Sequence, residues 1–168
     1  MGMCACYYLL NKKEEEDFIS LSSKGEEELL DYIDEELEGS DDLVDIDKMW
    51  DALHFVFTGT ECGIDLENPL SIAVAGEIEL NVSDEYVALV SKEKIPQVVK
   101  AISEFDMPKA LENFSMQKCK EAEIYPNIWD YEEELEEIRE ELQDAYNELL
   151  AFYQKAEEQG KSVLVTIY

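Results

Sequence analysis

Arginine is nearly absent from this chain: Arg139 is the only one among 168 residues. Lysine and arginine together number 13, against 42 aspartates and glutamates, so the formal net charge is −29 at pH 7. Nucleic-acid binding draws much of its affinity from basic side chains on phosphates, and anionic lipid surfaces attract the same side chains. Clamps for phosphates usually depend on arginine forks. The composition therefore argues against nucleic acid, membranes and nucleoside triphosphates as partners.

Long apolar runs are also missing. No stretch approaches the ~20 apolar residues of a membrane-spanning helix, and the start of the chain carries no basic region of a secretory signal. We therefore expect a cytoplasmic protein whose cysteines are reduced thiols. A hydrophobic share of 46% suits one globular domain, residues 1–168. The cysteines are Cys4, Cys6, Cys62 and Cys119.

Familiar enzyme and metal-site motifs do not occur, among them G-x-S-x-G, H-E-x-x-H, G-x-x-x-x-G-K-[ST] and C-x-x-C. The acidic stretch 41–47 lacks the bend glycine and the final glutamate of a calcium loop. Cys4 and Cys6 are separated by one residue, whereas zinc knuckles prefer two or more. A zinc site with Cys62 and His54 can be drawn, but buried apolar cysteines are the better interpretation. We expect no metal ion and no cofactor.

The remaining pattern predicts an α+β domain. An unbroken apolar run at residues 3–10 predicts a strand buried on both faces. Apolar spacing predicts helices whose ends carry recognisable caps, with Asn68-Pro69 as a start, Gly59 and Gly160 as stops, and Asp130 with Glu133 as a capping box. We predict a single domain with a small, mostly antiparallel sheet packed against several helices. The further strands are expected at 86–91 and 162–168, and the helices at 14–37 in two pieces, 47–57, 69–76, 95–105, 108–123 and 131–159.

The segment 45–60 concentrates uncommon residues, including the only histidine, His54, and one of two tryptophans, Trp50. These two lie four positions apart and share the apolar face of the predicted helix. Structurally, His54 is a buried imidazole bonded to a backbone carbonyl or to Asp51. Functionally, it is a general base at a cleft floor whose ring Asp51 orients. The structural interpretation is favoured, because a single histidine on an amphipathic helix is more often packing than catalysis.

A pocket near His54 is the alternative. Thr58-Gly59-Thr60 supplies hydroxyls and free carbonyls, and the Asn68-Pro69 helix start supplies free N–H groups for a small anion. Cys62 is a candidate nucleophile, although adjacent Glu61 and the anionic chain raise the pKa expected for its thiol. His54 and Asp51 are the candidate catalytic residues. The candidate ligand-binding residues are Trp50, His54, Thr58, Thr60, Ser71 and Glu77.

Two segments, 26–47 and 132–141, are dense in carboxylates. On the long helix several glutamates, such as Glu137 and Glu141, form like-charged i,i+4 pairs that each cost roughly 0.2–0.5 kcal/mol. Such faces are either ordinary solvated surface or complementary to a basic protein partner.

Several short stretches together resemble one family. The most specific is W-x-x-L-H-x-x-x-T-G-T, residues 50–60. In order they resemble the YfbM-like family, a bacterial domain of unknown function. The resemblance implies an α+β domain of this length in a bacterial cytoplasm and carries over no catalytic residue. The stretches are Met1-Gly2-Met3, Asp45-Ile46-Asp47-Lys48-Met49-Trp50, Leu53-His54-Phe55, Thr58-Gly59-Thr60, Asn68-Pro69-Leu70-Ser71, Ala73-Val74, Gly76-Glu77 and Glu123-Ile124-Tyr125-Pro126.

Two functional hypotheses follow. The leading one is a non-enzymatic, acidic binding module for a basic protein partner, in the manner of an inhibitor or immunity protein. The alternative is a small-molecule-binding protein or a hydrolase-type enzyme with a pocket near His54. The first rests on the charge and on the lack of a complete nucleophile, base and orienting group; the second rests on the uncommon residues around His54.

Overall fold

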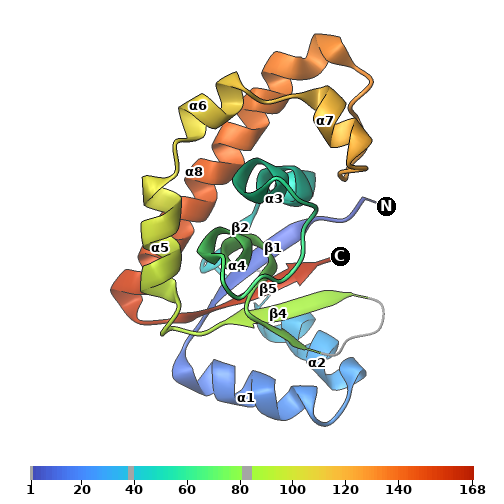
Figure 1. Cartoon of the computed structure of the whole chain (residues 1–168). Helices are drawn as coiled ribbons and strands as arrows, with labels where there is room; N and C mark the ends of the chain where they lie inside the picture. The colour runs from blue at the N-terminus through green and yellow to red at the C-terminus, as the bar shows by residue number, and fades with distance from the viewer. Residues whose placement is uncertain (1, 38–39, 81–84) are drawn as a thin grey trace.

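The computed structural model describes residues 2–37, 40–80 and 85–168. These residues build one five-stranded sheet with helices on both faces, as Figure 1 shows. The strand order is β2-β1-β5-β4-β3, and every neighbouring pair is antiparallel. The predicted α+β fold with an antiparallel sheet is therefore confirmed. The strands are β1 (Ala5–Leu10), β2 (Leu43–Asp45), β3 (Ile78–Leu80), β4 (Tyr86–Val90) and β5 (Ser162–Ile167).

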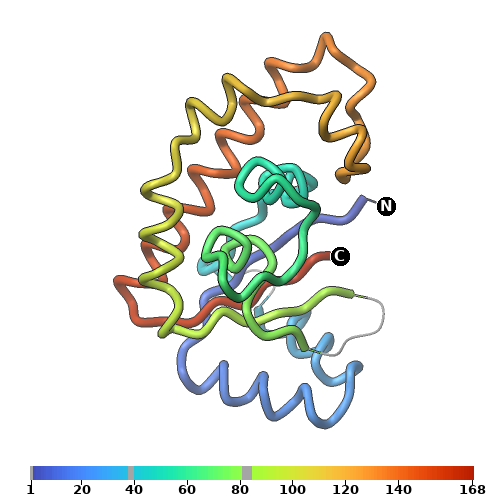
Figure 2. The backbone as a smooth tube through the Cα atoms, viewed as in Figure 1, coloured from blue at the N-terminus to red at the C-terminus, as the bar shows by residue number. Residues whose placement is uncertain are grey.

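The two chain ends meet at the centre of this sheet. β1 pairs with β5 along its full length, from Ala5 opposite Ile167 to Leu10 opposite Ser162. Cys4 and Tyr168 continue the ladder with a reciprocal pair of backbone hydrogen bonds of 2.8 and 3.1 Å, so both ends emerge side by side in Figure 2. All six residues of each strand are buried, because helices cover both faces. The two-sided burial predicted for the first strand is confirmed.

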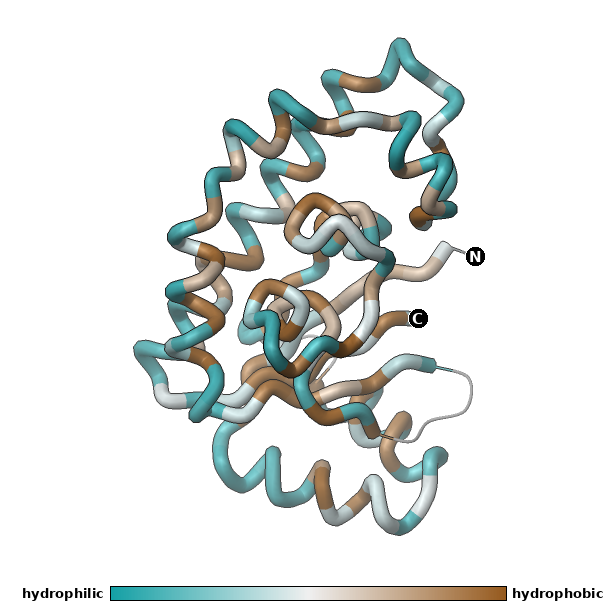
Figure 3. Tube along the Cα trace, viewed as in Figure 1, coloured by the Kyte–Doolittle hydropathy of each residue, from teal (hydrophilic) through white to brown (hydrophobic). Residues whose placement is uncertain are grey.

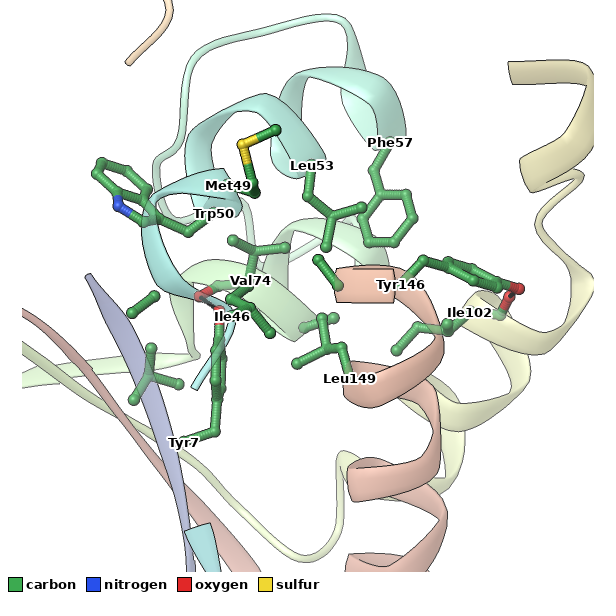
Figure 4. Packing of buried hydrophobic residues seen from close by; sticks show 14 of the residues in the cluster. Tyr7, Ile46, Met49, Trp50, Leu53, Phe57, Val74, Ile102, Tyr146 and Leu149 are labelled. Carbon is green, nitrogen blue, oxygen red and sulfur yellow. Dashed lines mark hydrogen bonds between the residues drawn. The ribbon is translucent and has the colours of Figure 1, made fainter. Parts of the chain in front are cut away.

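The larger core lies on one face of the sheet, under four helices. Alternate strand residues such as Tyr7 and Val165 point into it, and their neighbours point to the opposite face. Figure 4 shows Leu53 and Phe57 directed toward the long helix, where Tyr146 and Leu149 lie. The helices are α3 (Trp50–Thr58), α4 (Pro69–Ala75), α5 (Ile95–Glu104) and α8 (Leu135–Gln159).

A smaller core fills the other face. Tyr8 and Leu10 of β1 pack there against Phe18 and Leu29. In Figure 3 the brown segments gather around the sheet, and the outward helix surfaces are largely teal. No helix in the described ranges combines the length and apolar character needed to cross a bilayer. The covering elements are α1 (Lys12–Ser22), α2 (Glu26–Tyr32) and the π-helical turn η1 (Ile33–Leu37).

Several predicted helices differ in their bounds. The predicted 47–57 helix opens with the 3-10 turn η2 (Asp47–Met49), and the 108–123 stretch divides into α6 (Met107–Glu112) and α7 (Met116–Glu121). The division occurs because the Ser115 side chain accepts from Lys118 N and starts a new helix.

The helix caps are partly as predicted. The Asn68 side chain accepts from Leu70 N, while Gly59 and Gly160 end their helices in the left-handed region, with φ of 77° and 62°. The capping box of Asp130 with Glu133 is wrong. A 3-10 turn, η3 (Glu132–Glu134), occupies that position, and α8 begins after it without a side-chain cap.

Candidate functional site

His54 lies at the junction of α3, α4 and the loop that joins them, and only 2% of its surface is exposed. Its Nδ1 lies 3.0 Å from the carbonyl oxygen of Thr60, and its Nε2 lies 2.8 Å from Ser71 Oγ. The Ser71 hydroxyl is in turn 2.6 Å from the carbonyl oxygen of Gly63. The glycine stop at Gly59 makes this possible, since it turns the chain back toward its own helix.

The three contacts Thr60–His54, His54–Ser71 and Ser71–Gly63 each need one hydrogen between the two atoms. A carbonyl oxygen only accepts, so the Thr60 contact needs a proton on Nδ1, and the Gly63 contact uses the single hydroxyl hydrogen of Ser71. Nε2 must then donate to Ser71. All three contacts are hydrogen bonds together only when both ring nitrogens of His54 carry protons; a neutral ring leaves one contact without a hydrogen.

Thr58 closes the same junction. Its hydroxyl donates to the His54 carbonyl at 2.9 Å and lies 3.0 Å from Thr60 Oγ1. It also lies 3.2 Å from Nδ1 of the ring. The structure thus brings together four of the predicted site residues, His54, Thr58, Thr60 and Ser71. Their side chains hydrogen-bond to one another and to backbone carbonyls. The structural interpretation of His54, a buried imidazole bonded to a backbone carbonyl, describes this arrangement.

Asp51 does not hydrogen-bond to the ring of His54, which the functional interpretation of His54 required. Its carboxylate, with 6% of the residue exposed, accepts from Cys62 N at 2.6 Å and from Tyr125 N at 2.9 Å. A buried carboxylate is favourable only with such donors. Asp51 therefore joins α3 to two distant loops, one after the helix and one before η3.

Trp50 and Glu77 lie apart from this junction. The Trp50 indole donates to the Met3 carbonyl at 3.1 Å and stacks on Tyr125 with 5.5 Å between ring centroids. Glu77 follows the far end of α4, a helix about 10 Å long, and accepts from Ser91 N and Oγ. The structure does not bring Glu77 into one pocket with Ser71, because Ser71 lies in the first turn of α4 and Glu77 lies beyond its last residue.

The cysteines are all free thiols in the structure. Burial, with the nearby Asp51 carboxylate, raises the pKa of Cys62 to about 12, and the same two causes raise the pKa of Cys119 to about 12. A hydrogen bond with Asp47 and burial raise the pKa of Cys4 to about 11, and burial raises the pKa of Cys6 to about 11. A nucleophilic thiolate is therefore not supported. Within the described ranges no three His, Cys, Asp or Glu side chains form a group that could hold a metal.

Two concavities that the sequence did not predict lie elsewhere. The first, which we call the acidic hollow, has a volume of about 240 Å³ between η2 and α8 and is lined by five carboxylates over apolar side chains. The carboxylates of the acidic hollow are Asp45, Asp47, Glu141, Asp144 and Glu148.

The second concavity, the α3–α7 groove, has a volume of about 390 Å³ and mainly apolar walls. The groove is lined by Phe55, Val56, Gly59, Ala110, Asn113, Phe114, Ser115 and Lys118.

The apolar character of the 50–58 segment is a sequence signal that indicates the groove. α3 is apolar on nearly every side: Leu53 and Phe57 are buried and directed toward α8, and Phe55 and Val56 are only partly buried. A helix that is apolar all round needs cover on all its faces. The hollow brings together residues that are far apart in the sequence, such as Asp47 and Glu141, which no local pattern predicts.

The family model of a domain of unknown function, DUF1877, matches residues 1–166. Protein YfbM of Escherichia coli (strain K12) is 32% identical over 170 residues, which cover 99% of this chain and 99% of that protein. The crystal structure of a protein of unknown function, YfbM from Escherichia coli, is similar with a TM-score of 0.78 and 26% identity; the match covers 98% of this chain and 99% of that chain. The resemblance to YfbM-like proteins is confirmed, and the chain belongs to the DUF1877 family.

Proposed function

We propose that this protein is a non-enzymatic binding module whose acidic hollow receives a lysine- or arginine-rich segment of a protein partner, in the manner of an inhibitor or immunity protein. The observation that carries the proposal is the hollow itself. Five carboxylates from two separate parts of the chain line one concavity of about 240 Å³. A concavity of one charge sign attracts a ligand of the opposite sign and speeds its approach.

No lysine or arginine of the described residues lines the hollow itself, and Lys48, which follows Asp47 in the chain, lines the adjoining concavity. Within the described residues, ion pairs are formed by Lys12, Lys120, Arg139, Lys155 and Lys161, and their acidic partners lie outside the hollow. Arg139 is the basic residue of the N-terminal half of α8, and it pairs with Glu136 at 2.6 Å. A partner's cation is thus the charge that would neutralise the five carboxylates.

The surroundings of Glu141 disfavour the charge of its carboxyl group. Partial burial and then the charges of Glu137, Asp47 and Glu134 raise the pKa of its carboxyl above the ordinary value. A raised pKa of an acid means that its ionised form is disfavoured in the fold. A cationic side chain in the hollow would oppose the part of this shift that comes from neighbouring carboxylates, among which Asp47 also lines the hollow.

The alternative, catalysis or ligand binding at His54, has weaker support. Both ring nitrogens have protein partners, and the ring is buried. We place the module in a bacterial cytoplasm, which the free thiols and the bacterial relative support. The charge of −29 favours a protein partner over nucleic acid or membrane.

Capture of proteins from a host lysate tests the proposal. The wild-type protein should retain a basic protein at low salt and release it at high salt. The double variant Glu141→Gln/Asp144→Asn should lose it. The control Glu157→Gln/Glu158→Gln removes the same charge from exposed positions at the far end of α8 and should retain it.

Two results would overturn the proposal. One is that the wild-type protein retains no salt-sensitive basic protein. The other is that the two double variants lose the partner equally, because binding would then follow total charge and not the hollow. Circular dichroism spectra of both variants establish that they remain folded.

A further inference from the structure

The α3–α7 groove has the dimensions and walls of a small-molecule site. Its volume of about 390 Å³ falls in the range of roughly 300–1,000 Å³ typical of ligand pockets. Phe55 and Val56 of α3 form one side, and Ala110 and Phe114 form the other. In Figure 1 the chain from α6 to α7 arches over α3, so the two sides come from separate segments. These apolar side chains are only partly buried, and a ligand there would remove apolar surface from water.

Lys118 is the one charged residue that lines the groove. It is exposed, and no carboxylate of the described residues lies within 4.0 Å of its ammonium group. Eight of the 13 basic residues form no ion pair within the described ranges, and Lys118 is the member of this group that lines the groove. Its three ammonium hydrogens are therefore available to an external acceptor at the edge of an apolar surface.

Two further polar groups adjoin the lysine. Ser115 Oγ accepts from Lys118 N at 3.3 Å, which leaves the hydroxyl hydrogen to be donated. The Asn113 amide nitrogen donates to the Lys109 carbonyl at 2.9 Å. The groove thus offers a cation and a hydroxyl donor among its apolar walls.

We propose that this groove binds a small monocarboxylic acid with an apolar body, its carboxylate on Lys118 and its hydrocarbon part against Phe55, Val56 and Phe114. A cationic ligand would be repelled by Lys118, and a neutral apolar one would leave the ammonium group unused. A carboxylate satisfies it with charge-assisted hydrogen bonds. The site shares no lining residue with the acidic hollow, so it is independent of the proposed partner binding.

Octanoate and 1-octanol are suitable probes, because they share a chain and differ in the charged group. We expect saturable octanoate binding by calorimetry, with amide shifts in ¹H–¹⁵N spectra concentrated at Gly59, Ser115 and Lys118. Octanol should bind about tenfold more weakly, the usual effect of losing a hydrogen bond to a charged group.

Substitutions inside and outside the groove show whether octanoate binds there. Lys118→Met keeps the apolar stem and should reduce octanoate affinity to that of octanol. Lys109→Met removes the same charge from a neighbouring exposed position outside the groove and should leave it unchanged. Ala110→Trp fills the groove and should abolish binding of both probes. Amide spectra of each variant report whether the fold is retained.

Three outcomes would overturn the proposal: octanoate that does not saturate, amide shifts that map outside the groove, or equal octanoate affinity in Lys118→Met and Lys109→Met. Lys118 is exposed and unpaired, so its variant is expected to fold and the comparison remains decisive.

Discussion

His54 Nε2 and Ser71 Oγ lie 2.8 Å apart and join α3 to α4 in the interior of the protein. The Ser71 hydroxyl donates a hydrogen bond to the Gly63 carbonyl, and His54 Nδ1 lies within hydrogen-bond distance of the Thr60 carbonyl. One imidazole thus fixes two helices and the loop between them. The only histidine of the chain works here as a structural crosslink, and its neighbours form its bonding partners.

His54→Ala tests this role. The substitution leaves a cavity and removes the partners of the Thr60 carbonyl and the Ser71 hydroxyl. We expect a loss of about 2–4 kcal/mol in the free energy of unfolding, measured by urea denaturation. Ser71→Ala, which removes one hydroxyl and no ring, should lose less. A His54→Ala protein of unchanged stability would contradict the structural role and favour a functional one.

Asp51→Ala addresses the second buried polar group of α3. The change leaves the N–H groups of Cys62 and Tyr125 without their acceptor, and each unsatisfied buried donor costs about 1–3 kcal/mol. We expect a severely destabilised protein in the same denaturation experiment. Asp51→Asn retains one acceptor oxygen and should recover part of the loss. A stability of Asp51→Ala close to that of the wild-type protein would show that these bonds contribute little.

The sequence predicted the fold better than the site. The apolar runs at both chain ends predicted two central strands, and Asn68, Gly59 and Gly160 marked helix ends, because these signals are local. β2 and β3 were not predicted: each has three residues and lies at an edge of the sheet, too short for an alternating pattern to appear.

For the site residues too, the sequence indicated local neighbours but not partners that are distant along the chain. His54, Thr58, Thr60 and Ser71 are close together, as their positions around one turn and one helix start indicated. The partners of Asp51 could not be predicted, because Tyr125 lies 74 positions along the chain. The same holds for the acidic hollow and the α3–α7 groove, which form only when distant helices pack.

Asp42 joins the loop before β2 to the end of α8. Its two carboxylate oxygens accept from Lys155 at 2.7 Å and from Lys161 at 2.9 Å. Both hydrogen bonds lower the pKa of Asp42 below its ordinary value of 3.8. A lowered pKa in the folded state stabilises the fold above about pH 4, and this stabilisation is lost as the pH falls through the lowered value.

Asp42→Asn should therefore cost roughly 1 kcal/mol at pH 7, because the pair is partly exposed and a surface pair contributes little. The difference from wild type should shrink below pH 4. Urea denaturation of both proteins between pH 2 and pH 8 measures it. A difference that is constant over this range would assign the cost to lost packing and not to the charge of Asp42.

The buried thiols predict the response to alkali. The pKa values of Cys62 and Cys119 are each raised by burial and by Asp51 from the ordinary 9.0 to about 12. Unfolded thiols ionise near pH 9, before the folded ones. Their contribution to stability is therefore complete below about pH 9 and is lost as the pH rises toward 12. The free energy of unfolding should decline over that window, and that of the Cys62→Ala/Cys119→Ala variant should decline less steeply than that of the wild-type protein.

At pH 8 both thiols should react with iodoacetamide at least about 100-fold more slowly in the native protein than in urea, since the thiolate is the reacting form. Mass spectrometry of the modified cysteines measures this ratio, and rapid native labelling of Cys62 would contradict its burial and revive its assignment as a nucleophile.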